Sequence, residues 1–195
     1  MELKTSLTLI GVAITIVVGV AYIRDVYRGK TKPHLVTWLI WSVLAGTGCI
    51  IQIIGGGGLG SMVLGVTALM NLVILGTAWR RSRHDITRFD KLVLGLAAIA
   101  VAAWLVTNNP RFSAILVTLT MLIGFIPTYK KSFRAPVQES ISLFLWSGIK
   151  QFIGIAALSA YNLLTLLFPL ALIFGNFSLV ALLAIRRRQL KTSGK

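Results

Sequence analysis

The chain alternates between long apolar segments and short polar ones. Seven apolar segments come close to the roughly 20 residues that a helix needs to cross the hydrocarbon core of a bilayer. They are Leu7–Ile23, Leu35–Ile54, Leu59–Ala78, Leu92–Val106, Phe112–Thr128, Ser140–Ala157 and Leu163–Ile185. The fourth segment is the shortest. The pattern predicts an all-α membrane protein with seven transmembrane helices.

The composition supports the same interpretation. Hydrophobic residues make up 56% of the 195 residues and charged residues only 13%, with a mean hydropathy of +0.83. Soluble proteins do not have such values, so we expect an integral membrane protein. The single cysteine, Cys49, excludes an internal disulfide.

One sequence pattern occurs twice. Tyr22–Ser42 runs from an apolar helix end through a basic turn and a proline to a Trp-Ser pair, and Phe125–Ser147 repeats this order. Matching residues keep nearly one shift, which is 103 from Pro33 to Pro136 and 105 from both Trp41 to Trp146 and Asn71 to Asn176. Such a repeat fixes architecture before any local detail does.

The repeat predicts two parallel three-helix units joined by a connector helix, a 3+1+3 arrangement. We expect the first unit at residues 1–83, the connector at 84–109, the second unit at 110–188 and a tail at 189–195.

The basic residues indicate the topology. The net charge is +15, and most of the 20 Lys and Arg residues fall in the first, third and fifth interhelical segments and the C-terminal tail, all on one side of the membrane. Because Lys and Arg accumulate in cytoplasmic loops, we expect the N-terminus outside and the C-terminus in the cytoplasm, in a bacterial inner (plasma) membrane. Topology and membrane lipid therefore account for the charge, and nucleic acid is not expected as a partner.

The turn of each unit resembles a known transporter signature. The second unit has Pro127-Thr128 followed by Lys130-Lys131, and the first has Arg24-Asp25 followed by a basic turn and Thr37. This plan resembles the SWEET, SemiSWEET and PQ-loop superfamily of transporters, although its Pro-Gln pair is degenerate here. The resemblance implies alternating access, with an asparagine of the third helix of each unit, Asn71 and Asn176, at the substrate pocket.

Several polar residues are predicted to share one layer near the bilayer midplane. At a rise of about 1.5 Å per residue, Asn71, Asn176, Lys150, Thr15 and Thr120 all lie about halfway along their segments. Repeat-built transporters bind their substrates at this depth. The candidate substrate-binding residues are therefore Asn71, Asn176, Lys150, Gln151, Thr15 and Thr120.

Lys150 is the sharpest of these candidates. A charge at the bilayer centre costs at least about 2.5 to 3.5 kcal/mol. All five carboxylates, including Asp25, Asp85 and Glu139, lie in loops or at helix ends. Lys150 is therefore neutral, reaches water in a cavity, bonds to polar neighbours or meets an anionic ligand. Relief by snorkelling or by a purely structural hydrogen bond is the alternative, just as both asparagines could simply join helices.

Tryptophans and prolines near the basic side are candidate moving parts. Trp38, Trp41 and Trp146 are predicted gate residues, with an aromatic belt at the membrane interface as the alternative. The predicted hinges are Pro33, Pro127 and Pro136.

These observations favour a transporter over an enzyme. The sequence has no catalytic set and no metal-spaced cluster, so no catalytic activity, cofactor or metal is expected. The expected solute is small and polar, a sugar, carboxylate or vitamin, and an anionic one is among the alternatives. A non-transporting scaffold that binds lipid or a partner through its basic loops is the competing hypothesis. The oligomeric state is left open, with a homo-oligomer among the alternatives.

Overall fold

The computed structural model describes residues 2–81, 87–107 and 109–193, and all regular structure in these ranges is helical. The predicted boundary between residues 83 and 84 and the charges of Arg83, Asp85 and Lys195 lie outside the described residues. The long helices are α1 (Glu2–Tyr27), α2 (Leu35–Ile54), α3 (Met62–Arg81), α4 (Arg88–Thr107), α5 (Pro110–Arg134), α6 (Ile141–Ala157) and α7 (Leu163–Ser193). Two short 3-10 helices, η1 (Gly58–Ser61) and η2 (Pro136–Gln138), precede α3 and α6.

Local capping explains where several helices begin. Asn109, Ser140 and Asn162 each stand directly before a helix, and each side chain accepts a hydrogen bond from backbone N–H groups of the first turn. Such caps satisfy donors that have no partner inside the helix. At α4, Thr87 and Asp90 form a reciprocal box, because each side chain accepts the backbone N–H of the other.

The helices have the length and surface of membrane spans. Within the described residues, six helices are long and apolar enough to cross a bilayer, namely α1 to α5 and α7. The seventh, α6, has 17 residues and is shorter, at the lower end of the usual range. Large apolar side chains such as Leu9, Val17 and Val106 face outward. The chain is therefore an all-helical membrane protein.

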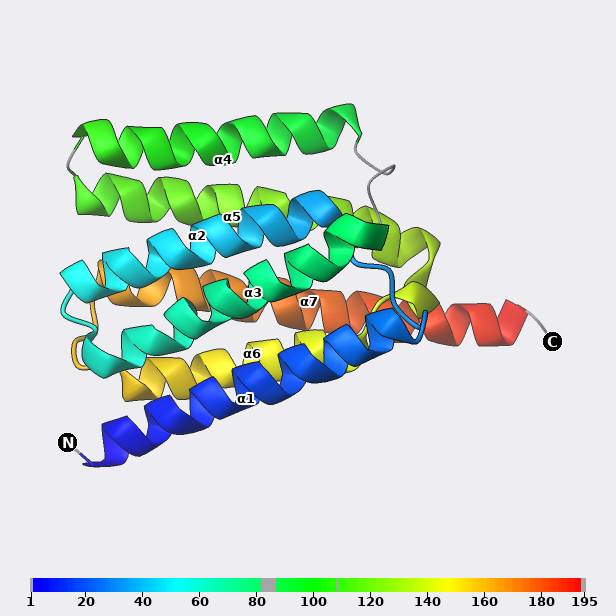
Figure 1. The fold of residues 1–195 in the computed structure, drawn as a ribbon, viewed down its shortest axis with the longest axis horizontal. Coiled ribbons are helices and arrows are strands. Elements are labelled where there is room, and N and C mark those ends of the chain that lie inside the picture. The colour runs from blue at the N-terminus through cyan, green and yellow to red at the C-terminus, as the bar shows by residue number, and fades with distance from the viewer. Residues whose placement is uncertain (1, 82–86, 108, 194–195) are drawn as a thin grey trace.

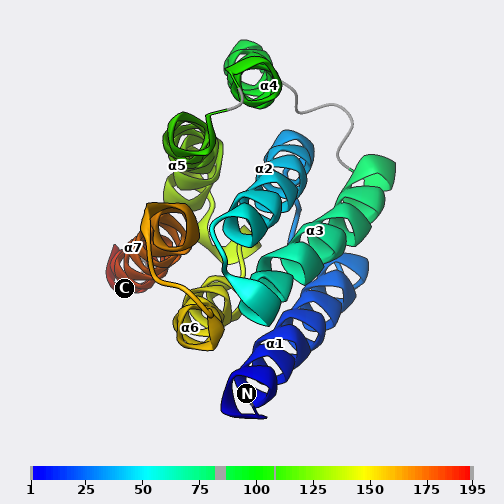
Figure 2. The same cartoon turned by 90° about the vertical axis from the view of Figure 1, so that its left-hand side faces the viewer.

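Six helices form a closed ring. Going round it, α1 packs on α3, α3 on α2, α2 on α5, α5 on α7, α7 on α6, and α6 again on α1 (Figure 2). Each of α3 and α7 thus lies between the two helices that precede it. The remaining helix, α4, lies outside the ring against α5 and α2. Odd-numbered helices run in one direction and even-numbered helices in the other, so the two termini lie at opposite ends (Figure 1).

Small residues allow α1 to join the ring closely. Its inner face is a stripe with Gly11, Thr15 and Gly19 at helical spacing. A Cβ on Gly11 would stand 2.9 Å from a methyl carbon of Val63 on α3, so glycine is needed for this approach. The outer faces of α1 carry exposed apolar side chains such as Leu9 and Val20.

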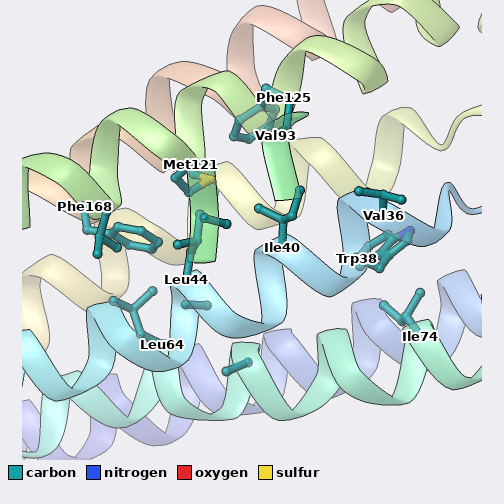
Figure 3. Packing of buried hydrophobic residues seen from close by; sticks show 14 of the residues in the cluster. Val36, Trp38, Ile40, Leu44, Leu64, Ile74, Val93, Met121, Phe125 and Phe168 are labelled. Atoms are coloured by element: carbon teal, nitrogen blue, oxygen red, sulfur yellow. The ribbon is translucent and has the colours of Figure 1, made fainter. Parts of the chain in front are cut away.

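An apolar cluster fills the ring between α2 and α5. Ile40 and Leu44 of α2 point toward Met121 and Phe125 of α5, and Val93 attaches α4 to the same cluster (Figure 3). All five side chains are almost completely buried. This cluster positions the helices on which the polar cavity described below depends.

We call the two ends of the bundle the basic end and the glycine end. The basic end holds the α1–α2 connection, the α5–α6 connection and the C-terminal part of α7 (Figure 1). The glycine end holds the connection from Gly55 into η1 and the connection from Leu158 to Asn162.

One prediction at the basic end is wrong. The basic residues after Pro127 were expected to form a turn, but α5 continues through them to Arg134. Pro127 removes one backbone donor, yet the residues after it are compatible with helix, and the Tyr129 hydroxyl donates to the Gly175 carbonyl of α7 at 3.2 Å. The turn comes later, at η2.

Candidate functional site

A cavity of about 60 Å³ lies inside the ring. Every helix of the ring contributes to its lining, and no described side chain of α4 does. The polar part of the lining consists of Thr15, Thr67, Asn71, Ser147, Lys150, Gln151 and Asn176. The apolar part includes Trp38, Trp41, Met121, Phe125, Phe144 and Phe168.

Lys150 of α6 is held by two hydroxyl groups. Its side chain is 5% exposed, and Nζ donates to Thr67 Oγ1 at 2.8 Å and to Thr15 Oγ1 at 3.2 Å. Each hydroxyl proton is already used, because Thr67 donates to the Val63 carbonyl and Thr15 to the Gly11 carbonyl. Both oxygens can therefore only accept hydrogen bonds from Lys150.

No carboxylate among the described residues pairs with Lys150. The ion pairs found within the described ranges are His34 with Asp90 and Lys131 with Glu139, both at the basic end. A protonated lysine has three N–H donors, and the two threonines take two of them. The third donor of Lys150 has no protein acceptor among the residues described here, and the cavity lies beside it.

Three amide side chains add further hydrogen-bonding capacity. Asn176 of α7 donates to the Leu172 carbonyl one turn earlier, at 2.7 Å. Asn71 of α3 and Gln151 of α6 are 8% and 2% exposed, and their side chains form no hydrogen bond with the described part of the chain. Buried amides of this kind are normally satisfied, so these two are suited to receive a polar ligand or water.

Aromatic side chains separate the cavity from the basic end. Trp38, Trp41 and Phe144 line the cavity on one side and a small hollow with Thr37, Thr128 and Glu139 on the other. The ring centroids of Trp38 and Trp41 are 5.4 Å apart, and those of Trp41 and Phe125 4.7 Å. We call Trp38, Trp41 and Phe144 the aromatic wall.

Polar contacts close the basic end beyond this wall. Thr128 Oγ1 lies 3.5 Å from Thr37 Oγ1, and Lys131 Nζ donates to the Lys32 carbonyl and to Glu139 Oε1, the latter at 2.6 Å. Burial raises the pKa of the Glu139 carboxyl, and the neighbouring Lys131 charge only partly opposes this effect.

The glycine end is closed by a second set of contacts. Gln52 Nε2 of α2 donates to the Thr165 carbonyl of α7 at 2.7 Å, and Asn162 Nδ2 donates to the Gly55 carbonyl at 2.8 Å. Nearer the cavity, Phe168 of α7 lies against Gly48 of α2, where a Cβ would be 3.1 Å from its ring. The cavity is therefore enclosed toward both ends.

A larger groove of about 520 Å³ lies outside the ring at the basic end, between α4 and α5. Two of its basic side chains have partners, since Lys131 pairs with Glu139 and Lys130 lies 4.4 Å from the centre of the Phe89 ring, and the third, Arg134, is exposed. His34 lies 3.5 Å from Asp90. Because solvent screens the exposed charges of Lys130 and Arg134, an anion in the groove would gain less than one beside the buried Lys150.

Comparisons with known proteins found no match. No family model, curated protein or solved structure is similar to this chain. The function is therefore inferred from the cavity itself. Within the described ranges, no group of three His, Cys, Asp or Glu side chains could hold a metal ion.

The structure brings most of the predicted substrate-binding residues together. Thr15, Asn71, Lys150, Gln151 and Asn176 all line the one cavity. Thr120 does not, and its hydroxyl donates to the Leu116 carbonyl of its own helix at 2.8 Å. On α5 the cavity-facing residues are Met121 and Phe125. The shift of 105 leads from Thr15 to Thr120, which is one residue before Met121. One residue along a helix corresponds to a rotation of about 100°.

Of the three predicted gate residues, two line the cavity and one does not. Trp38 and Trp41 belong to the aromatic wall, whereas Trp146 is 45% exposed on the outside of the bundle. The cavity-facing stripe of α6 runs through Leu143, Ser147 and Lys150, and Trp146 lies to one side of it.

Of the predicted hinges, Pro33 and Pro136 are buried in the two connections at the basic end. Pro127 lies inside α5 and lines the outer groove.

Sequence reasoning missed several lining residues. Thr67 lies one turn before Asn71, and Ser147 lies one turn before Lys150. Residues one turn apart share a face of a helix, so Asn71 and Lys150 could have indicated these two residues. The phenylalanines Phe125, Phe144 and Phe168 had no such signal, because apolar residues occur on all faces of these helices.

Proposed function

We propose that this protein is a membrane transporter that moves a small polar solute by alternating access. The observation that carries the proposal is the cavity inside the ring, in which Lys150, Asn71 and Gln151 combine burial with unused hydrogen-bonding capacity. Unsatisfied polar groups are costly in a membrane, so their presence inside the ring is best explained by a ligand.

The proposed architecture is two three-helix units with α4 as their connector. In this arrangement α1, α2 and α3 correspond to α5, α6 and α7. The contact of α1 with α6 then corresponds to the contact of α5 with α2, and both contacts are present. The third helix lies between the other two in each unit, and matching helices point the same way (Figure 1). Parallel repeats that enclose a midplane site are a common transporter plan. The resemblance to the SWEET, SemiSWEET and PQ-loop superfamily stays part of this proposal.

Both closures join one unit to the other. At the basic end Thr37 meets Thr128, and at the glycine end Gln52 meets Thr165. Rocking of the units can therefore break one set of contacts while it keeps the other. In this mechanism the aromatic wall opens with the basic end, and Phe168 moves with the glycine end.

We also propose the membrane orientation. The basic end faces the cytoplasm, since Lys and Arg accumulate there, and the glycine end faces outward. This places the N-terminus outside and the C-terminus inside.

The test is solute permeation into proteoliposomes. Vesicles with the purified protein are shrunk by a hyperosmotic pulse of each of several small polar solutes, and light scattering follows their reswelling. We expect at least one solute to enter faster than into protein-free vesicles. Replacing both asparagines by a side chain of similar size, Asn71→Leu with Asn176→Leu, should remove this permeation while the protein remains folded by size-exclusion chromatography.

If no solute enters faster than into protein-free vesicles, the transporter proposal is wrong. The scaffold hypothesis would then be tested by binding to vesicles that contain anionic lipid, for which the basic end supplies the charge.

A further inference from the structure

We propose that the cavity binds a small monocarboxylate, with the carboxylate on Lys150. This inference rests on the proposed solute site and specifies its substrate class. The evidence for it is the set of groups around the Lys150 side chain. Lys150 is buried in the middle of the ring, its supports are two neutral hydroxyl oxygens, and no described acidic residue pairs with it.

The two threonines leave the lysine prepared for an anion. They hold the ammonium group between α1 and α3 but add no negative charge. Hydroxyl acceptors replace only part of the hydration that a buried ammonium loses, so a compensating negative charge is strongly favoured. An anionic ligand can provide it, because the third N–H donor is available on the cavity side.

The amides indicate a carboxylate. A carboxylate has two oxygens, and the Lys150 ammonium can bind one of them. Asn71 and Gln151 have amide N–H groups without protein partners among the described residues, and they line the same cavity. One of these amides can donate to the second oxygen.

The charge of the site limits the ligand to a monoanion. Lys150 is the one ionisable side chain among the described residues of the lining, so a dianion would leave a net negative charge in the membrane. The remaining surface is formed largely by Trp38, Trp41, Phe125 and Phe168, which suits a short apolar or weakly polar group on the other end of the ligand.

The volume sets the size. At about 10 to 15 Å³ for each water molecule, a cavity of about 60 Å³ holds about four of them. Propanoate is of this size, whereas a hexose is much larger and would need the aromatic wall to move. The smallest monocarboxylates therefore fit the enclosed state as it stands.

The experiment compares two solutes that differ in charge and hardly in shape, propanoate and propanamide. Thermal unfolding of the purified protein is measured across a concentration series of each, with potassium chloride at equal ionic strength as the control. Because a hydrogen bond to a charged group is stronger than one between neutral groups, we expect propanoate to bind at least about tenfold more tightly than propanamide. Chloride should not reproduce this stabilisation.

Three variants locate the effect. Lys150→Met should remove the preference for propanoate, and Lys150→Arg should retain it because the positive charge is kept. The matched control is Lys130→Met, an exposed lysine of α5 at the basic end, which should behave like the wild type. The wild-type comparison alone decides the inference if Lys150→Met does not fold.

Equal stabilisation by propanoate and propanamide, or a preference that persists in Lys150→Met, would overturn the carboxylate assignment and leave the solute site in place. No stabilisation by propanoate overturns the assignment as well. The permeation test then separates the two proposals, since entry of any neutral solute preserves the transporter, whereas no entry at all removes both.

Discussion

The residue that most needs its neighbours is Lys150. A lysine in the middle of a membrane helix is costly unless it is surrounded by acceptors, and here the acceptors are hydroxyl groups from two other helices, Thr15 on α1 and Thr67 on α3. Each threonine also bonds to its own helix, so the lysine links three helices through side chains that are themselves fixed.

Removal of one acceptor should show this dependence. Thr67→Val keeps the shape of the side chain but leaves a Lys150 donor without its partner, so we expect a loss of about 1 to 3 kcal/mol in unfolding free energy. The matched control is Thr107→Val, because Thr107 is exposed and its hydroxyl bonds only to the Ala103 carbonyl of its own helix. Denaturant unfolding in detergent measures both. Equal losses in the two variants would mean that Lys150 does not depend on Thr67.

The carboxyl group of Glu139 predicts a pH dependence. Burial raises its pKa above the ordinary value of 4.5, so the folded protein keeps the proton over a range in which the unfolded chain has lost it. Stability therefore falls as the pH rises through that range. We expect the melting temperature of the wild type to fall from pH 4.5 toward neutrality more than that of Glu139→Gln.

The matched control is Glu2→Gln, which removes the other glutamate of the chain at an exposed position. It should follow the wild-type curve. A Glu139→Gln curve parallel to the wild type would show that this carboxyl does not contribute to the pH dependence.

At the scale of elements, the close contact of η1 with the end of α6 decides the shape of the glycine end. A Cβ on Gly60 would stand 2.7 Å from the backbone carbonyl carbon of Ala157, and backbone cannot rotate away as a side chain can. We expect Gly60→Ala to lower the unfolding free energy by about 1 to 3 kcal/mol through overpacking.

Gly76→Ala is the matched control for this prediction. Gly76 lies in the neighbouring helix α3, and nothing stands within 4 Å of the position of its Cβ. An alanine there should be neutral or stabilise the helix by up to about 1 kcal/mol. Thermal unfolding of both variants measures the difference, and a Gly60→Ala protein as stable as Gly76→Ala would contradict the contact.

The elements themselves were largely predictable. The apolar segment Leu35–Ile54 has the same bounds as α2, and the other six segments lie inside helices or differ from them by a few residues. Length and hydropathy suffice for this, because a backbone in lipid must satisfy its own hydrogen bonds as a helix. The end of α5 was missed, because the basic residues after Thr128 suggested a turn, whereas the helix continues through them and packs on α7.

At the scale of the whole molecule, alternating access requires the basic end to open. Thr37 of α2 and Thr128 of α5 belong to different units of the proposed architecture, with their hydroxyl oxygens 3.5 Å apart. With Cys49→Ala as the background, we expect the pair Thr37→Cys and Thr128→Cys to form a disulfide on oxidation and to stop solute permeation. A reductant should restore it.

Each single cysteine variant serves as a control and should remain permeable after oxidation. Full permeation through the cross-linked protein would mean that these two helices do not separate during transport.

The orientation can be tested on intact cells. A membrane-impermeant maleimide should label Tyr161→Cys at the glycine end and leave Val137→Cys at the basic end unlabelled until the cells are opened. Both positions are well exposed, at 57% and 67%, so accessibility within the fold does not bias the result. The reverse pattern would invert the proposed topology.

The sequence by itself determined that this chain is helical and resides in a membrane, and it indicated the layer in which Lys150, Asn71 and Asn176 lie. These features depend on hydropathy, charge and distance along a helix, which a sequence states directly. The tertiary structure decided which face of each helix is turned inward. A helix in lipid is apolar on all sides, so its pattern does not select a face, and one residue of register rotates it by about 100°. For this reason Thr15 and Thr67 meet Lys150, while Thr120 and Trp146 lie away from the cavity.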